Sequence, residues 1–415
     1  MDNITHSLAG LVLAESAVQL RARMTGRASS AGFRTAAAIS SLVAANLPDF
    51  DLLYTGVGGD RLAYMLHHRG HTHTVVIAIV GAILLWGVAS SVWRWRARVS
   101  PVREDVNWLL GLVLVSTLSH LVLDWTNSYG VHPFWPFDDA WRYGDAVFIV
   151  EPWFWVVAVP VLVAASVRRS ARVVLSLILA LGLGLAWRVD LVSRGAAIAL
   201  TIGAAASILL ARALRPGARI GVAVAAWVAV TLVMAAGASV ARAAVRQAVR
   251  SADPAAELLD VVVTPLPANP VCTSVITVER SGEVYRVLTA RVSGAPSVTA
   301  AARCGAREGA GPMFRAATRE SSPAVRWDSE WAASATELET LARESCPALA
   351  ALRFIRVPAW RAIDDSTVMI GDVRYGGASG RGFSDVAVPR RSAVCPEAVP
   401  PWVPPRVDVI GAPRW

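Results

Sequence analysis

Long apolar runs separated by short, arginine-bearing loops fill the first 250 residues of the chain. Six of these runs approach the ~20 residues that a helix needs to cross a bilayer, and they cover residues 72–93, 107–123, 150–167, 171–187, 195–211 and 218–241. Two weaker runs precede them, at 4–20 and 35–47. The first contains Glu15 and Gln19, and it either spans obliquely, re-enters the membrane or packs inside the bundle. The pattern predicts an all-α polytopic membrane bundle of about six to eight transmembrane helices.

The pattern changes after residue 250. Residues 246–260 are expected to carry the last helix out of the membrane and to end it near Pro254. Ser281 and Gly282 predict a hairpin turn, and residues 334–352 predict a helix. Strands are predicted where residues alternate in polarity or are β-branched, at 261–264, 273–280, 283–292, 368–375 and 383–388. We therefore expect a membrane-embedded region that carries the chemistry (1–155), further transmembrane helices (156–250) and a small α+β domain (251–415).

Composition agrees with a membrane protein. The chain has 415 residues, of which 54% are hydrophobic, and its mean hydropathy of +0.47 is too high for a soluble protein of this size. The net charge of +9 comes from 40 basic residues, all of them arginine. Many of these arginines lie in short loops between apolar runs, so they are interpreted as setting topology, and no nucleic-acid partner is expected.

Arginine placement predicts an orientation. If both weak runs cross, the loops at 21–34, 94–106, 168–172 and 212–219 hold 14 arginines, against 5 in the alternating loops at 48–71, 125–149 and 188–194. Positive charge marks the cytoplasmic side. The second set, the N-terminus and the region after residue 250 are therefore expected outside the cytoplasm, on a multi-pass protein of the cell (inner) membrane.

The cysteines point to the same compartment. All four follow the last apolar run, at Cys272, Cys304, Cys346 and Cys395. An even number of cysteines confined to one extracytoplasmic domain is typical of disulfides. Three pairings are possible, and the sequence does not choose among them.

Histidine and aspartate gather before residue 155. All seven histidines lie within the first 132 residues. His120 and Asp124 are four residues apart in an apolar helical run, so they share one helix face, and ionisable groups inside a membrane helix are usually functional. Imidazole is also the commonest metal ligand. The candidate metal ligands are His6, Asp49, His68, His73, His120 and Asp124.

Three further residues are candidates for catalysis. Asp51 or Glu151 is expected to complete the metal shell or to accept a proton from water, and Arg69 is expected to bind an anionic group. Gly70 allows a sharp turn, and Thr72 or Thr74 is expected to cap the helix that follows. The N-terminus of that helix would favour a phosphate. Of the histidines at 67, 68, 71 and 73, one or two are expected to be spectators, and His132 is expected to be a loop residue.

These strings, in this order, resemble the YdjM-like family of membrane-bound metal-dependent hydrolases. The family pattern is an early histidine, then Pro-Asp-x-Asp, His-Arg-Gly-x-Thr-His-Ser/Thr, and Ser-His-x-x-x-Asp followed by glycine and proline. The matching positions here are His6, Pro48, Asp49, Asp51, His68, His73, Ser119, His120, Asp124, Gly130 and Pro133. The resemblance covers roughly residues 1–155 and implies a divalent-metal site on a helical bundle. More distantly, the arrangement is similar to zinc-dependent phospholipase C and P1 nuclease, which implies phosphoester substrates.

The expected function is metal-dependent hydrolysis of a small-molecule or lipid phosphoester, or another lipid-linked substrate, at the outer face of the membrane. Mixed histidine and carboxylate ligands suit Zn²⁺ best, with Mn²⁺ or Fe as alternatives. Membrane lipid is the expected partner, and the sequence carries no signal for an oligomeric state. The alternative is a protein without enzymatic activity, either a metal transporter or a scaffold whose external domain binds a partner.

Overall fold

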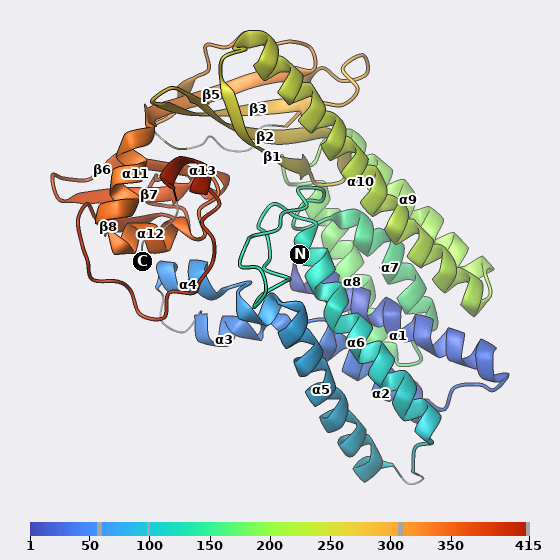
Figure 1. Ribbon diagram of the computed structural model, residues 1–415. Coiled ribbons are helices and arrows are strands. Elements are labelled where there is room, and N and C mark those ends of the chain that lie inside the picture. Colours follow the sequence, from blue (N-terminus) through green and yellow to red (C-terminus); the bar gives the residue numbers. More distant parts are fainter. Residues whose placement is uncertain (56–59, 98–99, 306–310, 312, 412–415) are drawn as a thin grey trace.

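A bundle of helices forms the N-terminal half of the chain (Figure 1). The computed structural model describes residues 1–55, 60–97, 100–305, 311 and 313–411. The longer helices are α1 (Asn3–Thr25), α2 (Ala31–Ala44), α5 (Val75–Arg96), α6 (Arg103–Trp125), α7 (Pro152–Ala165), α8 (Arg169–Ala186), α9 (Arg194–Ala213) and α10 (Pro216–Ala252). Between α2 and α5 lie η1 (Pro48–Asp51), α3 (Leu52–Thr55), α4 (Arg61–His67) and η2 (His71–His73).

Within the described residues, five helices are long and apolar enough to cross a membrane: α5, α6, α8, α9 and α10. A sixth is counted if α2 and the segment Pro48–Thr55, which are bent by 51° at their junction, form one broken span. α7 has 14 residues and is shorter. The multi-pass membrane half is therefore confirmed, whereas the expected total of six to eight spans is not.

The first weak apolar run forms α1, which packs against α2, α6, α7 and α10. It is not among the described helices that are long and apolar enough to cross a membrane. The second weak run ends at Ala44, and Pro48 then begins η1 in a new direction. Proline lacks the N–H that would continue the α2 ladder, so the chain turns here and brings Asp49 and Asp51 to one end of the bundle.

The C-terminal half is built on two antiparallel sheets. The first has the strand order β1-β2-β3-β5-β4 and the second β6-β7-β8. Their strands are β1 (Glu257–Leu266), β2 (Asn269–Ser281), β3 (Val284–Ser293), β4 (Arg315–Ala316), β5 (Val325–Ser334), β6 (Pro358–Ala362), β7 (Thr367–Asp372) and β8 (Val386–Pro389). The remaining elements are η3 (Ala301–Arg303), α11 (Ala335–Glu344), α12 (Cys346–Leu352), η4 (Val373–Tyr375) and α13 (Val407–Ile410). Val284 pairs with Ser281 across Gly282, which confirms the expected hairpin.

Several boundaries differ from expectation. The helix expected over 334–352 is two helices, because Ser345 leaves the helical conformation and Pro347 restarts the chain as α12. β7 ends at Asp372 rather than at residue 375, and β8 begins only at Val386. Strands β4, β5 and β6 were not expected.

The last helix links the two halves. α10 has 37 residues and ends at Ala252, close to the expected end near Pro254. At a rise of 1.5 Å per residue it is about 55 Å long, and Figure 1 shows it running from the bundle to the sheet. Its far end packs on β1 and β2 through Ala241, Val245 and Val249. Two disulfides, Cys272–Cys304 and Cys346–Cys395, choose one of the three pairings.

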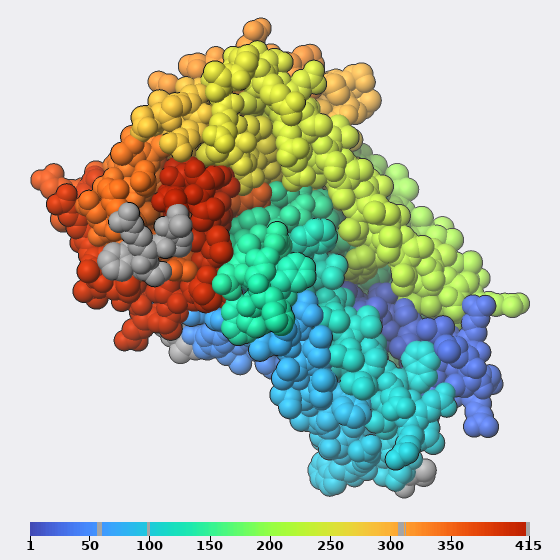
Figure 2. All heavy atoms as spheres, in the orientation of Figure 1, coloured from blue at the N-terminus to red at the C-terminus, as the bar shows by residue number. Residues whose placement is uncertain are grey.

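The two halves also share a hydrophobic core. Met65, Tyr129 and Trp141 of the N-terminal half are buried in the same cluster as Phe354 and Trp402 of the C-terminal half. Figure 2 shows the red and orange C-terminal atoms in contact with the green atoms of the loop that follows α6. The C-terminal half therefore covers the end of the bundle at which the His/Asp motifs lie.

Candidate metal centre

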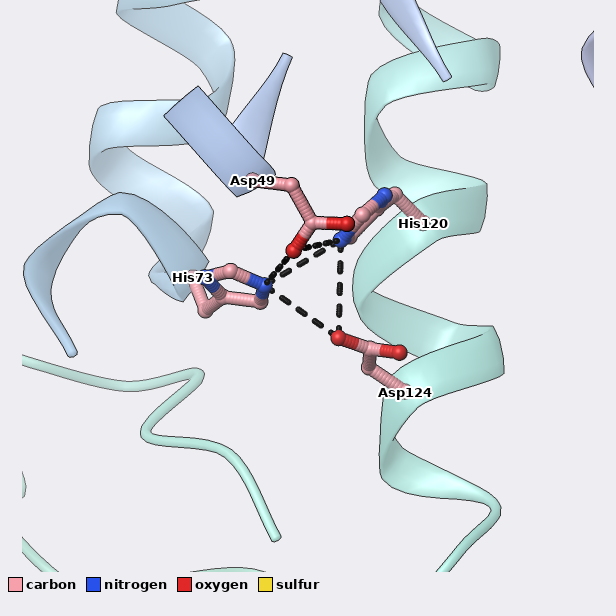
Figure 3. A group of neighbouring side chains, drawn as sticks. All are labelled: Asp49, His73, His120 and Asp124. Atoms are coloured by element: carbon pink, nitrogen blue, oxygen red, sulfur yellow. Dashed lines mark hydrogen bonds and ion pairs between the residues drawn. The ribbon is translucent and has the colours of Figure 1, made fainter. Parts of the chain in front are cut away.

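Four side chains from three parts of the bundle converge at one end of α6 (Figure 3). They are Asp49 on η1, His73 on η2, and His120 and Asp124 on α6. One ligand atom from each lies within 4.8 Å of all the others. His73 Nε2 and His120 Nε2 are 3.2 Å and 3.4 Å from Asp124 Oδ2. The side chains of His73, His120 and Asp124 are fully buried, and that of Asp49 is 9% exposed.

The histidine tautomers are set by their outer nitrogens. His120 Nδ1 lies 2.7 Å from the carbonyl oxygen of Ala45, so it carries the proton and donates. His73 Nδ1 lies 3.1 Å from the Thr72 hydroxyl, which itself donates to Asp51, and 3.4 Å from Asp51 Oδ2, so it also carries a proton. When both imidazoles are neutral with these outer nitrogens protonated, their Nε2 atoms present lone pairs toward each other across 3.1 Å.

Two facing lone pairs repel unless a cation lies between them. With zinc–nitrogen bonds of 2.0–2.1 Å in tetrahedral geometry, two ligating nitrogens are about 3.3–3.4 Å apart, close to the observed 3.1 Å. Asp124 Oδ2 is buried and faces the same space, within 3.4 Å of both Nε2 atoms. The donor set therefore fits a divalent metal ion, and hydrogen bonds to the outer nitrogens are the usual support of ligating histidines.

Asp51 organises the loop that carries His68 and His73. Its carboxylate accepts hydrogen bonds from His68 Nδ1 at 3.1 Å, the Arg69 backbone N–H at 2.9 Å and the Thr72 hydroxyl at 3.0 Å. A second group of mutually close ligand atoms, Asp49, Asp51 and His68, adjoins the first and shares Asp49 with it. These hydrogen bonds make Asp51 the residue that holds the loop in place beside the centre.

The turn between His68 and η2 depends on two residues. Arg69 has the left-handed φ of 58°. Gly70 has a negative φ, but a Cβ there would lie 2.8 Å from the carbonyl oxygen of His67. The sequence predicted a sharp turn that depends on Gly70, and the structure has this turn. Glycine is needed because a side chain here would come too close to the His67 carbonyl, whereas the left-handed backbone conformation is that of Arg69. Thr74 caps α5 by accepting from the Ile77 N–H, as one of the two expected candidates.

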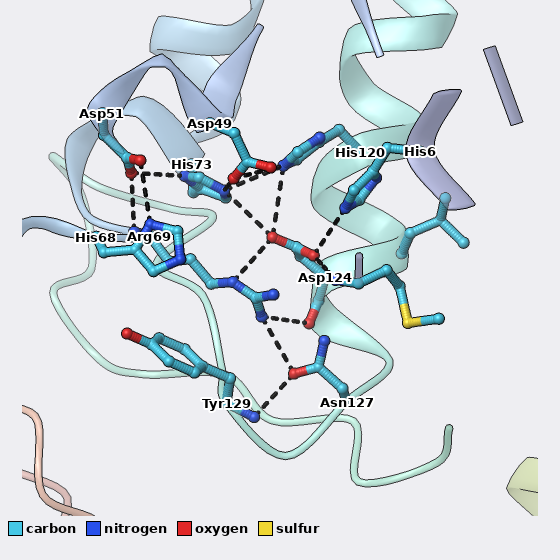
Figure 4. Close-up of polar contacts among 12 residues, drawn as sticks. His6, Asp49, Asp51, His68, Arg69, His73, His120, Asp124, Asn127 and Tyr129 are labelled. Atoms are coloured by element: carbon cyan, nitrogen blue, oxygen red, sulfur yellow. Dashed lines mark hydrogen bonds and ion pairs between the residues drawn. The ribbon is translucent and has the colours of Figure 1, made fainter. Parts of the chain in front are cut away.

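Arg69 lies inside the centre rather than at its rim (Figure 4). Its Nε is 3.0 Å from Asp124 Oδ2, and its Nη1 donates to the side chain of Asn127 at 3.1 Å. The guanidinium also lies 4.6 Å from the centre of the Tyr129 ring. This arrangement gives Arg69 a second task besides the expected anion contact, because it neutralises part of the charge on Asp124.

His6 is adjacent to the centre. Its Nε2 is 3.1 Å from Asp124 Oδ1, and its ring stacks on that of His120 at 3.7 Å. The amino group of Met1 also pairs with Asp124 Oδ1. Neither group of mutually close ligand atoms found among the described residues includes His6. The geometry places His6 against the oxygen of Asp124 that faces away from His73 and His120.

The structure engages the remaining candidates elsewhere. Glu151 is buried, and its two carboxylate oxygens accept from the backbone N–H groups of Trp153 and Ala268. It caps α7 and fastens the β1–β2 turn to it. His71 packs against the rings of Trp135 and Trp402. Of the four clustered histidines, His67 and His71 belong to neither group of mutually close ligand atoms among the described residues.

Some residues of the site carried no signal in the sequence. Asn3 donates to Asp49 Oδ2 at 3.0 Å, and Ala45 contributes only its backbone carbonyl. Trp402, in the proline-rich tail, is fully buried; it donates to the carbonyl of Leu66, and its ring stacks on that of His132. No spacing in the sequence identifies a single asparagine, a backbone carbonyl or a distant tryptophan as part of the site.

Comparison with known proteins gives one family match, in the N-terminal part of the chain. No curated protein and no solved structure matches the chain significantly. The family described as YdjM inner membrane protein matches residues 1–191. That range contains every member of the centre, and it ends before α9 and the domain with the disulfides. The first 191 residues are therefore similar to the YdjM inner membrane protein family, and the metal centre lies wholly within them.

Proposed function

We propose that the protein is a membrane-bound, metal-dependent hydrolase that acts on a phosphoester or lipid-linked substrate. The observation that carries this proposal is the pair of imidazole Nε2 atoms, 3.1 Å apart, that face each other between two carboxylates in a buried centre. Such an arrangement of donors is costly to bury without a cation, because the lone pairs and the carboxylate charges repel. The match to an inner membrane protein family supports the setting.

Asp49, His73, His120 and Asp124 would hold the ion. Their mixed nitrogen and oxygen donors suit Zn²⁺ best, and Mn²⁺ or Fe also fits. A divalent ion in such a site lowers the pKa of water toward ~7 and polarises the scissile bond. We assign one ion per chain, because Asp51 and His68 of the adjoining group are already hydrogen bonded to each other.

His68 is the residue we propose as the proton acceptor. Its Nδ1 donates to Asp51, so its Nε2 carries the free lone pair. The hydrogen-bonded carboxylate orients the imidazole and stabilises the cation that forms when it takes a proton. His68 is 8% exposed, and its ring stacks on that of Tyr64.

Two features favour an anionic substrate. The guanidinium of Arg69 lies within the centre, 3.0 Å from Asp124 Oδ2. The N-terminus of α5 begins at Val75, two residues after His73, and helix N-termini attract phosphate. Both would favour the charge that develops on a phosphoryl group during hydrolysis.

We place the centre at the outer face of the inner membrane. The arginine-rich loops at 21–34 and 94–106 lie at the opposite end of α1 and α6 from His6 and Asp124. Positive charge favours the cytoplasmic side. The two disulfides lie in the half that covers the centre and are typical of an oxidising compartment.

The test is hydrolysis of bis(p-nitrophenyl) phosphate by the purified full-length protein. A chelator should abolish the rate, and Zn²⁺ or Mn²⁺ should restore it. Asp124→Asn should remove activity, because it deletes a ligand charge with little change in volume. Asp138→Asn is the matched control, since Asp138 pairs with Arg142 on the exposed loop. Full activity in the Asp124→Asn protein would contradict the proposal.

A further inference from the structure

An apolar groove runs along the bundle from the metal centre toward its other end. It encloses about 600 Å³ between α1 and α2 on one side and α7 and α8 on the other. Ile4, Leu11, Ala38, Leu42, Leu175 and Ile178 are among the residues that line it. This volume is typical of a binding site for a small molecule. The groove lies between helices of the membrane half, so it opens to lipid rather than to water.

One end of this groove reaches the metal centre. Asn3 lines the groove, and its side-chain amide donates to Asp49 Oδ2 at 3.0 Å. Asp49 is 9% exposed, whereas the side chains of His73, His120 and Asp124 have no exposure. The C-terminal half covers the centre from the other direction, through Trp402 and the residues packed around it. The partly open ligand is therefore hydrogen bonded to a residue that lines the groove.

The other end of the groove is polar. Glu15 and Arg34 line it and form an ion pair at 3.4 Å, and Arg168 lies with them on the α7–α8 turn. The stretch of α1 between these ends covers residues 4–14, where Ile4, Leu8, Leu11 and Ala14 line the groove together with Ser7. Ten helical steps of 1.5 Å make this stretch about 15 Å long, which is half of the ~30 Å hydrocarbon core of a bilayer. A groove of this length accommodates a hydrocarbon chain.

We propose that this groove binds a hydrocarbon chain of the substrate, so that the substrate is a membrane lipid that enters sideways and presents its phosphoester at Asp49. The reaction of the lipid headgroup in this inference rests on the proposed hydrolase function. The binding of the hydrocarbon chain in the groove does not depend on that function. The hydrocarbon chain of the lipid lies along α1 and α2. The headgroup lies at Asn3, and the free end of the hydrocarbon chain points toward Glu15 and Arg34. Exchange with the bilayer needs no opening of the C-terminal half.

Photo-cross-linking tests the binding step directly. The full-length protein is placed in phosphatidylglycerol vesicles in which a fraction of the lipid carries a diazirine on one acyl chain, and the labelled peptides are mapped by mass spectrometry. We expect labelling of the groove faces of α1, α2 and α8 several-fold above that of α5, whose outer surface is also exposed to lipid. Equal labelling of all these helices would overturn the proposal.

Two matched variants locate the chain. Leu42 lines the groove, whereas Leu181 of α8 is 72% exposed and is not among the lining residues. Leu42→Trp should reduce groove labelling several-fold, and Leu181→Trp should leave it unchanged. If both variants label like the wild type, the groove does not hold the chain.

Kinetics separate this inference from the proposed function. Leu42→Trp should raise KM for a long-chain phosphoester and leave the hydrolysis of bis(p-nitrophenyl) phosphate unchanged. An equal loss on both substrates would contradict a chain-binding groove. If the wild-type protein hydrolyses neither substrate, the proposed function fails, while the cross-linking result still decides whether the groove binds a lipid chain.

Discussion

At the scale of single residues, the centre is defined by which nitrogen of each histidine is free. His120 is held by a backbone carbonyl and His73 by Asp51, so both turn the same ring nitrogen inward. His71, two residues before His73, instead packs between aromatic rings. Neighbouring histidines on one short loop thus have different tasks, and they offer a matched pair of variants.

His73→Ala should remove the bound metal, because it deletes one of four ligands. His71→Ala should retain it, because His71 supplies no ligand atom to either group found in the described structure. Elemental analysis of both purified proteins, with size-exclusion profiles as the check on folding, gives the metal content per chain. Loss of metal from the His71→Ala protein alone would show that the wrong histidine has been assigned.

The residues that could be predicted are those whose spacing in the sequence already determines how they lie relative to one another in space. His120 and Asp124 are one helical turn apart, and Asp49 follows a proline that ends an apolar run, so their convergence could be inferred. Glu151 fitted a metal shell equally well in sequence, yet its carboxylate binds the N–H of Ala268. Ala268 lies in a turn between two strands, more than a hundred residues away. No local sequence pattern around Glu151 predicts this contact.

At the scale of elements, the C-terminal tail is the least predictable part of the fold. Trp402 lies in a proline-rich segment that was expected only to be extended, and it is fully buried against the loop with the histidines. Its indole N–H donates to the carbonyl of Leu66 on α4. The sequence shows the turn residues but not the surface on which the tail lies, because that surface is assembled from distant segments.

Trp402→Ala should release this tail. Truncation of a buried aromatic residue costs about 3–5 kcal/mol, and it leaves the Leu66 carbonyl without its donor. Limited proteolysis should then cut the tail faster, and the thermal unfolding midpoint should fall. Trp95→Ala is the control, since Trp95 is 79% exposed at the end of α5. Equal effects of the two substitutions would contradict the docking of the tail.

A buried ionic cluster joins four segments of the chain. Arg356 forms paired hydrogen bonds with Asp145, on the loop after α6, and with Asp260 on β1. Arg242 of α10 also pairs with Asp145 at 3.1 Å. Arg356→Ala would leave both carboxylates buried without this partner, which costs about 3–5 kcal/mol. A drop in the thermal unfolding midpoint of the purified protein would confirm it.

The same cluster predicts a pH dependence. Burial would raise the pKa of Asp260, but Arg356 and Arg406 outweigh it and lower the pKa from 3.8 to about 2. Folding therefore favours the ionised carboxylate, and this stabilisation is complete above pH ~5 and is lost as the pH falls toward ~2. The difference in unfolding midpoint between wild type and Arg356→Ala should shrink over that range. A difference that stays constant down to pH 2 would contradict the pairing.

At the scale of the whole molecule, the membrane bundle and the C-terminal half meet at one end. His6, Asp49 and Asp124 lie at the bundle end on which the sheets are mounted by α10. The membrane half was predictable because apolar runs of sufficient length are read directly from the sequence. The number of spans was not, because α7 has only 14 residues and the α2 segment is bent by 51°.

We predict that the metal centre and the C-terminal half lie together outside the cytoplasm. A reporter that is active only outside the cytoplasm, fused to the C-terminus, should be active. The pairs Cys272–Cys304 and Cys346–Cys395 should be oxidised in protein isolated from cells with its thiols blocked. An inactive reporter together with four reactive thiols would place this half in the cytoplasm and reverse the orientation.

The most direct test of the central claim is a titration of metal into the chelated full-length protein, with hydrolysis of bis(p-nitrophenyl) phosphate followed at each addition. The four ligand atoms within 4.8 Å of one another predict that the rate rises linearly and reaches its plateau at one equivalent per chain. The His120→Ala protein should show no such rise at the same concentrations. If the wild-type protein binds one equivalent of metal tightly and cleaves no phosphodiester, phosphomonoester or carboxylic ester, the centre is not hydrolytic and the account is contradicted.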